Sequence, residues 1–207
     1  LIIGTLNNKN FEYTNFAQLK EITVTGLDEI DNKKLIENLN LLRINNLYSL
    51  DKNQIIEILN LDNSIEKYSV FKKYPSSINI EINKTKILAK LSVKGKNFLL
   101  GSNGKLIEKK DEEYDVPFIF GNFEIKNFFE LREIIKKTGF DFYQIKNLFF
   151  FKSGRWDIET KKGVLIKLPS DNLEESLNLY NLFINDYKEG NIMKIDLRQK
   201  NQVIIDE

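Results

Sequence analysis

The sequence predicts an α+β fold in two domains, because helix-like and strand-like segments form two groups along its 207 residues. Residues 16–84 carry the order β-α-α-β-β, which is long enough to form a domain with a core of its own. Residues 85–207 read as a mixed, strand-rich β domain with two helices. Residues 1–15 precede both groups as a short leading segment. The chain is long enough to bury the two cores that this division requires.

The first domain opens with a strand at residues 19–25, in which Ile22 and Val24 share one face and Gly26 ends the strand. A helix follows, and Asp31 is placed to cap it. Its apolar residues recur at helical spacing, at Leu35, Ile36, Leu39 and Leu42. This stripe predicts a helix that packs on the sheet with one face.

A second helix begins after Asp51, which together with Gln54 resembles a capping box. Its inward face carries Ile55, Ile56 and Leu59. Strands at residues 66–73 and 78–82 come next, and the turn between them contains Pro75, which suits a turn and not a central strand. These two strands complete the β-α-α-β-β order of the first domain.

Short strands dominate the start of the second domain, with candidates at residues 87–93, 97–100 and 105–107. The sequence Ser102-Asn103-Gly104 separates two of them and is a strong turn signal, because Asn and Gly tolerate positive φ. This turn predicts a hairpin early in the second domain.

Two helices follow these strands. The stripe of the first helix consists of Phe128, Leu131 and Ile135. Gly139 ends that helix, since glycine readily adopts the left-handed conformation at a helix C-terminus. The second helix is capped near Asp171 or Asn172. Its stripe consists of Leu173, Leu177, Tyr180 and Ile184.

The most informative segment lies at the C-terminal end, where Met193, Ile195 and Leu197 alternate with charged residues. The pattern predicts one strand that continues through Val203 to Ile205. A final strand often lies at a sheet edge, where unpaired N–H and C=O groups accept a strand from another chain. The segment therefore favours a docking protein.

Composition excludes several classes of function. The chain has 31 Lys and Arg against 30 Asp and Glu, so it presents no electrostatic footprint for nucleic acid or anionic lipid. It contains no Cys and no His, which excludes thiol nucleophiles, imidazole bases and ordinary zinc sites. Neighbouring carboxylates at residues 111–113 and 174–175 fit a solvated loop and a first helical turn better than an acid–base pair. We expect no catalysis, no cofactor and no metal.

Three features allow two interpretations each. The run of Phe149, Phe150 and Phe151 fits a strand buried on both faces better than an exposed docking patch. Trp156 fits a core anchor better than a ligand platform. Asp196 and Arg198 can form an internal cross-strand ion pair or contact a partner, and the sequence favours neither. Their roles depend on the geometry of the last strand.

Several motifs resemble one family. Ile22-Thr23-Val24-Thr25-Gly26 resembles the opening strand of a POTRA domain, and residues 68–80 resemble its hairpin, in the form found in FtsQ/DivIB cell-division proteins. Residues 115–121, 154–158, 163–168 and 195–198 resemble, in the same order, motifs of the C-terminal β domain of that family. The resemblance is collinear from residue 16 to the end of the chain, which makes it more specific than any single motif.

The resemblance implies a non-catalytic scaffold of the bacterial divisome, with a POTRA domain at residues 16–84 and an FtsQ-type β domain at residues 85–207. It implies that the β domain binds the FtsB–FtsL coiled-coil pair and that the POTRA domain contacts other divisome members. It also implies a location on the periplasmic side of the inner membrane at the septum. Residues 1–15 would then be membrane-proximal, and the single-pass anchor would lie outside this sequence.

Strand addition at the last strand assigns partner binding to Arg198, Gln199, Lys200, Asn201, Gln202 and Val203. Two other classes remain open at this stage. A POTRA protein of outer-membrane assembly or secretion would need a downstream barrel of alternating strands. A carboxylate-dependent glycan hydrolase would need two carboxylates at a defined separation across a cleft, and no pair in the sequence is singled out.

Overall fold

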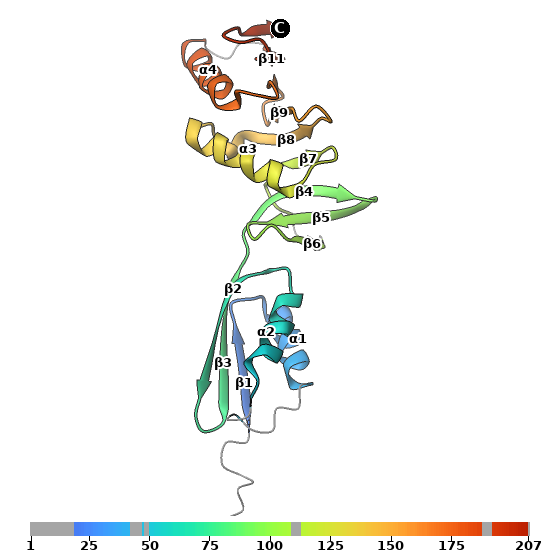
Figure 1. The fold of residues 1–207 in the computed structure, drawn as a ribbon, viewed down its shortest axis with the longest axis vertical. Coiled ribbons are helices and arrows are strands. Elements are labelled where there is room, and N and C mark those ends of the chain that lie inside the picture. Colours follow the sequence, from blue (N-terminus) through green and yellow to red (C-terminus); the bar gives the residue numbers. More distant parts are fainter. Residues whose placement is uncertain (1–18, 42–46, 48–49, 109–112, 188–191, 207) are drawn as a thin grey trace, which may run out of the picture. The chain divides into compact units, whose positions relative to one another are not determined.

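The computed structural model describes residues 19–41, 47, 50–108, 113–187 and 192–206 (Figure 1). The chain divides into two compact units, Leu1–Thr85 and Lys86–Glu207. The predicted leading segment, residues 1–15, lies outside the described residues. Within the described part of the chain, no helix has the length and apolar character needed to cross a membrane.

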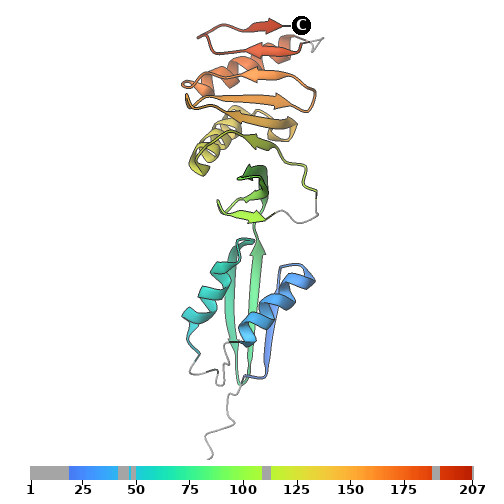
Figure 2. The same cartoon turned by 90° about the vertical axis from the view of Figure 1, so that its right-hand side faces the viewer.

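The first unit has the predicted β-α-α-β-β order. Its elements are β1 (Glu21–Thr25), α1 (Glu29–Asn40), α2 (Lys52–Leu61), β2 (Ile65–Lys73) and β3 (Ser77–Lys84). The sheet order is β1-β3-β2, with β1 parallel and β2 antiparallel to β3. Both helices lie on one face of this sheet (Figures 1 and 2). The core between them includes Leu39, Leu59 and Ile80, each at most 1% exposed.

The N-cap residues of α1 and α2 were both predicted, and the structure confirms only the prediction for α2. Asp51 caps α2, since its carboxylate accepts a hydrogen bond from Asn53 N–H at 2.9 Å. The predicted cap Asp31 is wrong, because α1 begins earlier, with Asp28 as N-cap. Asp31 lies in the first turn of α1 instead, where the helix dipole stabilises a negatively charged side chain. Leu42 of the predicted stripe lies outside the described residues.

The second unit is a nine-stranded mixed sheet with two α-helices. Its elements are β4 (Ile87–Val93), β5 (Lys96–Gly101), β6 (Leu106–Glu108), β7 (Phe118–Phe120), α3 (Ile125–Thr138), the 3-10 helix η1 (Phe142–Gln144), β8 (Ile145–Phe150), β9 (Trp156–Thr160), β10 (Leu165–Lys167), α4 (Leu173–Asp186), β11 (Lys194–Asp196) and β12 (Ile204–Asp206). The sheet order is β12-β11-β10-β9-β8-β7-β4-β5-β6, so β12 and β6 form the two edges. The α+β fold class with two helices in the second unit is thus confirmed.

Helices α3 and α4 lie side by side on one face of this sheet (Figures 1 and 2). Gly139 ends α3 in the left-handed conformation, as predicted. Trp156 is 2% exposed and contacts the rings of Phe123 and Phe150, so its interpretation as a core anchor is confirmed. Glu174 and Glu175 lie in the first turn of α4, as expected. The other neighbouring carboxylates, at residues 111–113, were predicted to lie in a solvated loop, and residues 111 and 112 lie outside the described residues.

Phe149 and Phe150 end β8, and Phe151 follows it. The prediction that these three residues form a strand buried on both faces is wrong. Phe150 packs toward Trp156 and the helices, but Phe149 stacks on Phe120, whose side chain is 44% exposed. Phe151 is 39% exposed and lies under the guanidinium of Arg155, 4.2 Å from ring centroid to Cζ. The prediction failed because the helices cover only one face of this sheet, so alternate residues of a central strand remain partly open to solvent.

Candidate functional site: the C-terminal sheet edge

The C-terminal end of the chain is a hairpin and not the single strand that the sequence predicted. Strands β11 and β12 pair antiparallel, with Ile195 opposite Ile205. Between them Gln202 N–H donates to the carbonyl of Gln199 at 3.2 Å, which closes a four-residue turn. Asn201 has φ +57°, a left-handed conformation that asparagine tolerates better than most residues. The continuous-strand prediction is wrong because this turn interrupts it.

The six predicted site residues therefore form one loop at the end of the second unit. Arg198, Gln199, Lys200, Asn201 and Gln202 are exposed, whereas Val203 is half-buried and packs against the core. The structure brings all six together, but it places them next to the outermost strand and not in it. Sequence reasoning missed that strand, which consists of Ile204, Ile205 and Asp206. The signal was available, since five polar residues, one of them Asn, separate Leu197 from the apolar residues that begin at Val203.

The hydrogen bonds of β11 show which backbone groups of β12 face outward. Leu165 N–H donates to the Met193 carbonyl at 3.0 Å, and Leu197 N–H donates to the Lys167 carbonyl at 2.9 Å. The N–H and C=O of Ile195, which lies between these two bonds, therefore face β10, and those of Lys194 and Asp196 face β12. Met193 N–H, just before β11, also donates to the Asp206 carbonyl of β12, at 2.9 Å.

The pairing between β11 and β12 shows which backbone groups of the edge strand β12 face outward. Ile204 and Asp206 lie opposite Asp196 and Lys194, so their backbone groups face β11. Backbone groups alternate along a strand, so the N–H and C=O of Ile205 point to the open side of the sheet. The side chains alternate as well, and that of Ile204 is 45% exposed while Ile205 packs against the core. The edge thus offers one outward donor–acceptor pair beside an exposed apolar side chain.

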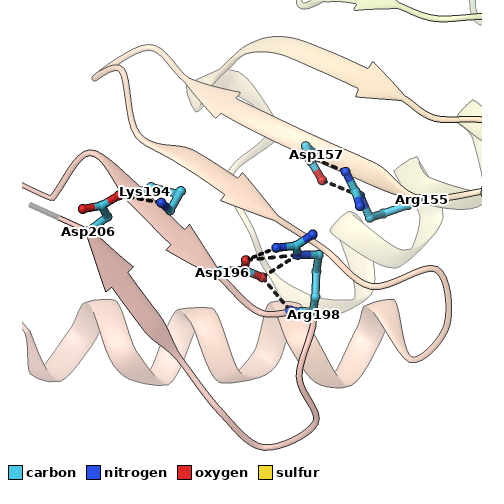
Figure 3. A network of polar contacts seen from close by, with 6 residues as sticks. All are labelled: Arg155, Asp157, Lys194, Asp196, Arg198 and Asp206. Carbon is cyan, nitrogen blue, oxygen red and sulfur yellow. Dashed lines mark hydrogen bonds and ion pairs between the residues drawn. The ribbon is translucent and has the colours of Figure 1, made fainter.

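A row of charges crosses the face of the sheet that α3 and α4 leave open, next to this edge (Figure 3). Asp157, Lys167 and Asp196 lie opposite one another on β9, β10 and β11. Arg155 donates to Asp157 at 3.1 Å, and Arg198 donates through Nε to both oxygens of Asp196, at 2.9 and 3.0 Å. The structure shows an internal ion pair, but between Asp196 and Arg198 themselves, two residues apart in the chain, and not the cross-strand pair that was one of the two interpretations.

The two aspartates of this row have opposite pKa shifts. Hydrogen bonds from the Arg198 side chain lower the pKa of Asp196 below its ordinary value. Burial raises the pKa of Asp157, although Arg155 and Lys167 oppose the shift. At the edge itself, the hydrogen bond from Lys194 lowers the pKa of Asp206 and ties β11 to β12.

Asp196 holds Arg198 without burying it. The Arg198 side chain is 43% exposed, while that of Asp196 is only 12% exposed. The guanidinium therefore has a fixed orientation and an open side, which allows a second carboxylate to approach it. The cation next to the sheet edge is preorganised and still accessible.

Both units match family models. Residues 17–85 match the POTRA domain of FtsQ type. Residues 90–198, more than half of the chain, match the C-terminal domain of the cell division proteins FtsQ and DivIB. The chain belongs to the FtsQ/DivIB family. The resemblance inferred from the sequence motifs is thereby confirmed.

Two relatives of this chain are cell division proteins. The cell division protein FtsQ of Rickettsia bellii is 24% identical over 195 residues, covering 92% of this chain and 72% of the relative. That of Rickettsia prowazekii is 22% identical over 193 residues, covering 91% and 72%. Among solved structures, the major extracytoplasmic domain of DivIB from Geobacillus stearothermophilus aligns with a TM-score of 0.36 and 13% identity, covering 52% of this chain and 99% of that chain.

Membership places this FtsQ/DivIB chain among the divisome proteins, which work through protein partners in cell division. The match to the C-terminal family model ends at Arg198. The turn and β12 follow that position, so the sheet edge lies just beyond the part of the chain that the family model describes. The geometry of the edge comes from this structure and not from the family match.

Proposed function

We propose that this chain is a non-catalytic divisome scaffold that docks the FtsB–FtsL pair by strand addition to β12. The observation that carries the proposal is the outward direction of the Ile205 N–H and C=O at an edge of the nine-stranded sheet. An incoming strand satisfies these two groups and extends the sheet by one strand.

The side chains around the edge supply specificity. The exposed Ile204 offers an apolar contact on the face that α3 and α4 leave open. Arg198, held by Asp196, offers a charge-assisted bond to an acidic side chain of the partner. Gln199, Lys200, Asn201, Gln202 and Val203 form the loop beside the edge and contact the partner next to its added strand.

Scaffolding without catalysis agrees with the chemistry of the chain. It has no His and no Cys, and in the part of the chain that the structure describes no group of three or more His, Cys, Asp or Glu side chains is arranged to hold a metal ion. In this proposal the POTRA domain recruits other divisome members, and both domains lie on the periplasmic side of the inner membrane at the septum. The alternative of an outer-membrane assembly or secretion protein finds no support in the C-terminal family match.

A pair of substitutions at one position tests strand addition. Ile205→Pro removes the outward N–H and should abolish binding of the FtsB-like protein of the same organism. Ile205→Ala truncates the side chain but keeps the N–H, so it should retain most of the binding. Isothermal titration calorimetry with the full chain measures both, and thermal unfolding shows whether each variant folds.

The opposite edge of the same sheet supplies the matched control. Gly101 N–H donates to the Lys105 carbonyl at 3.0 Å, so the alternation along β6 directs the N–H of Glu108 outward. Glu108→Pro should leave binding unchanged. Binding that survives Ile205→Pro, or is lost with Glu108→Pro instead, would place the interface elsewhere.

Proline substitutions within the loop are less informative. Asn201 has φ +57°, which proline cannot adopt, and the N–H of Gln202 already bonds inside the turn. Proline at either position would break the hairpin and remove the edge indirectly, so Ile205 is the position to change.

A further inference from the structure

A cavity of about 300 Å³ lies in the second unit, far from the β12 edge. It is open to solvent and is lined by the beginning of β4, the loop before β7, the C-terminal half of α3 and the residues around η1. Five strands separate β4 from β12 in the sheet, which corresponds to a distance on the order of 25–30 Å. The cavity is therefore a separate site from the edge.

The floor of the cavity consists of buried, closely packed apolar side chains. Leu88, Ile135, Phe140 and Ile145 line it and are each at most 7% exposed. These side chains belong to the main core of the second unit, so the floor is preformed. A floor of this kind accepts an aliphatic or aromatic side chain and gains hydrophobic free energy when that side chain displaces water.

The acidic and basic side chains that line the cavity differ in their partners: the two carboxylates accept hydrogen bonds, and the two cations have no carboxylate partner among the described residues. Asp115 accepts hydrogen bonds from Lys161 at 2.6 Å through both oxygens, and Asp141 accepts one from Tyr143 N–H at 3.0 Å. Among the described residues, by contrast, no carboxylate lies within ion-pair distance of Arg132 or Lys136. The guanidinium of Arg132 lies 6.0 Å from the centroid of the Phe142 ring.

The two cations are four residues apart on α3, so they lie on the same side of the helix. Of the two carboxylates that line the cavity, Asp115 is paired with Lys161, whereas Asp141 accepts a backbone hydrogen bond and keeps its charge. The cavity thus combines an apolar floor with two cations on the α3 side of its rim, which complements an apolar group that carries neighbouring negative charge. A free inorganic anion would leave the apolar floor empty, and nucleic acid would need a broader basic surface than a chain of net charge +1 provides.

We propose that this cavity binds an acidic peptide segment of a partner protein. One apolar side chain of the segment enters the cavity, and flanking carboxylates contact Arg132 and Lys136. A single side chain fits the available volume, and the carboxylates gain charge-assisted hydrogen bonds at the rim. The site gives the β domain a second point of attachment that is independent of strand addition at β12.

Nuclear magnetic resonance titration of the full, ¹⁵N-labelled chain tests the proposal with defined probes. The first probe is a capped tetrapeptide of one phenylalanine and three glutamates. In a second probe glutamine replaces each glutamate, and in a third glycine replaces the phenylalanine. We expect saturable shifts at the amides of Arg132, Lys136 and Tyr143 with the first probe, and at least about fivefold weaker binding of each of the other two.

Variants on α3 separate the charges of the rim from the general charge of the helix. Arg132→Gln combined with Lys136→Gln should weaken binding of the first probe about fivefold or more. Lys137→Gln, which removes the neighbouring cation outside the cavity, should not change it. Equal binding of the glutamate and glutamine peptides, shifts that do not saturate, or equal effects of the control and the double variant would overturn the proposal.

Discussion

Gly121 should be among the positions of the second unit that are most sensitive to substitution, because it allows β7 to approach β8 closely. It has φ +108°, and a Cβ there would lie 2.2 Å from the Phe150 carbonyl oxygen. Real Cβ contacts are essentially never below 3.0 Å, so the backbone would have to move. Positive φ costs an alanine about 1–2 kcal/mol, and forced overpacking adds about 1–3 kcal/mol. We expect Gly121→Ala to lower the free energy of unfolding by about 2–5 kcal/mol.

Gly163→Ala is the matched control for this prediction. Gly163 has φ +87°, but nothing lies within 4 Å of the position that a Cβ would occupy there, so only the conformational cost applies. Urea unfolding followed by circular dichroism should show Gly121→Ala less stable than Gly163→Ala by about 1–3 kcal/mol. Equal stability of the two variants would refute the close approach of β7 and β8.

Three further outcomes follow from the structure. Gly26→Ala, whose Cβ would lie 1.8 Å from the Ile82 carbonyl oxygen, should destabilise residues 19–85 expressed alone, and this fragment should unfold cooperatively when it is not substituted. Carboxyl titration by nuclear magnetic resonance should place the pKa of Asp196 below and that of Asp157 above the ordinary value of 3.8. Arg198→Ala should reduce stability slightly at pH 7, and the difference from the unsubstituted chain should disappear at acid pH, because the lowered folded-state pKa of Asp196 contributes stability that is lost as the pH falls through that pKa.

The local elements were predictable from the sequence because they depend on short-range spacing. The apolar segment from Ile87 to Val93 predicted strand β4 with its observed bounds, and Gly139 predicted the end of α3. The first unit followed from the same kind of evidence, apart from the start of α1. Asp28 and Asp31 are both acceptable caps by residue type, and only the hydrogen bond from Asn32 N–H to the Asp28 carbonyl shows where the helix begins.

The candidate site was predicted in its location but not in its geometry. The sequence identified the C-terminal end as a sheet edge, yet it placed the edge in the loop from Arg198 to Val203 and not in β12. Asn201 decides the difference, since an alternating pattern does not reveal a residue with positive φ. The charge row from Asp157 to Asp196 depends on pairing among three strands, two of them parallel, and no local pattern specifies such pairing.

Amide hydrogen exchange at Ile205 tests the central proposal most directly. The full chain is measured alone and with its FtsB-like partner, with Glu108 on the opposite edge as internal reference. Strand addition at β12 predicts that the Ile205 N–H exchanges at least about tenfold more slowly in the complex, while exchange at Glu108 is unchanged. Unchanged exchange at Ile205 in a saturated complex, with protection at Glu108 or in the POTRA domain instead, would contradict docking at β12.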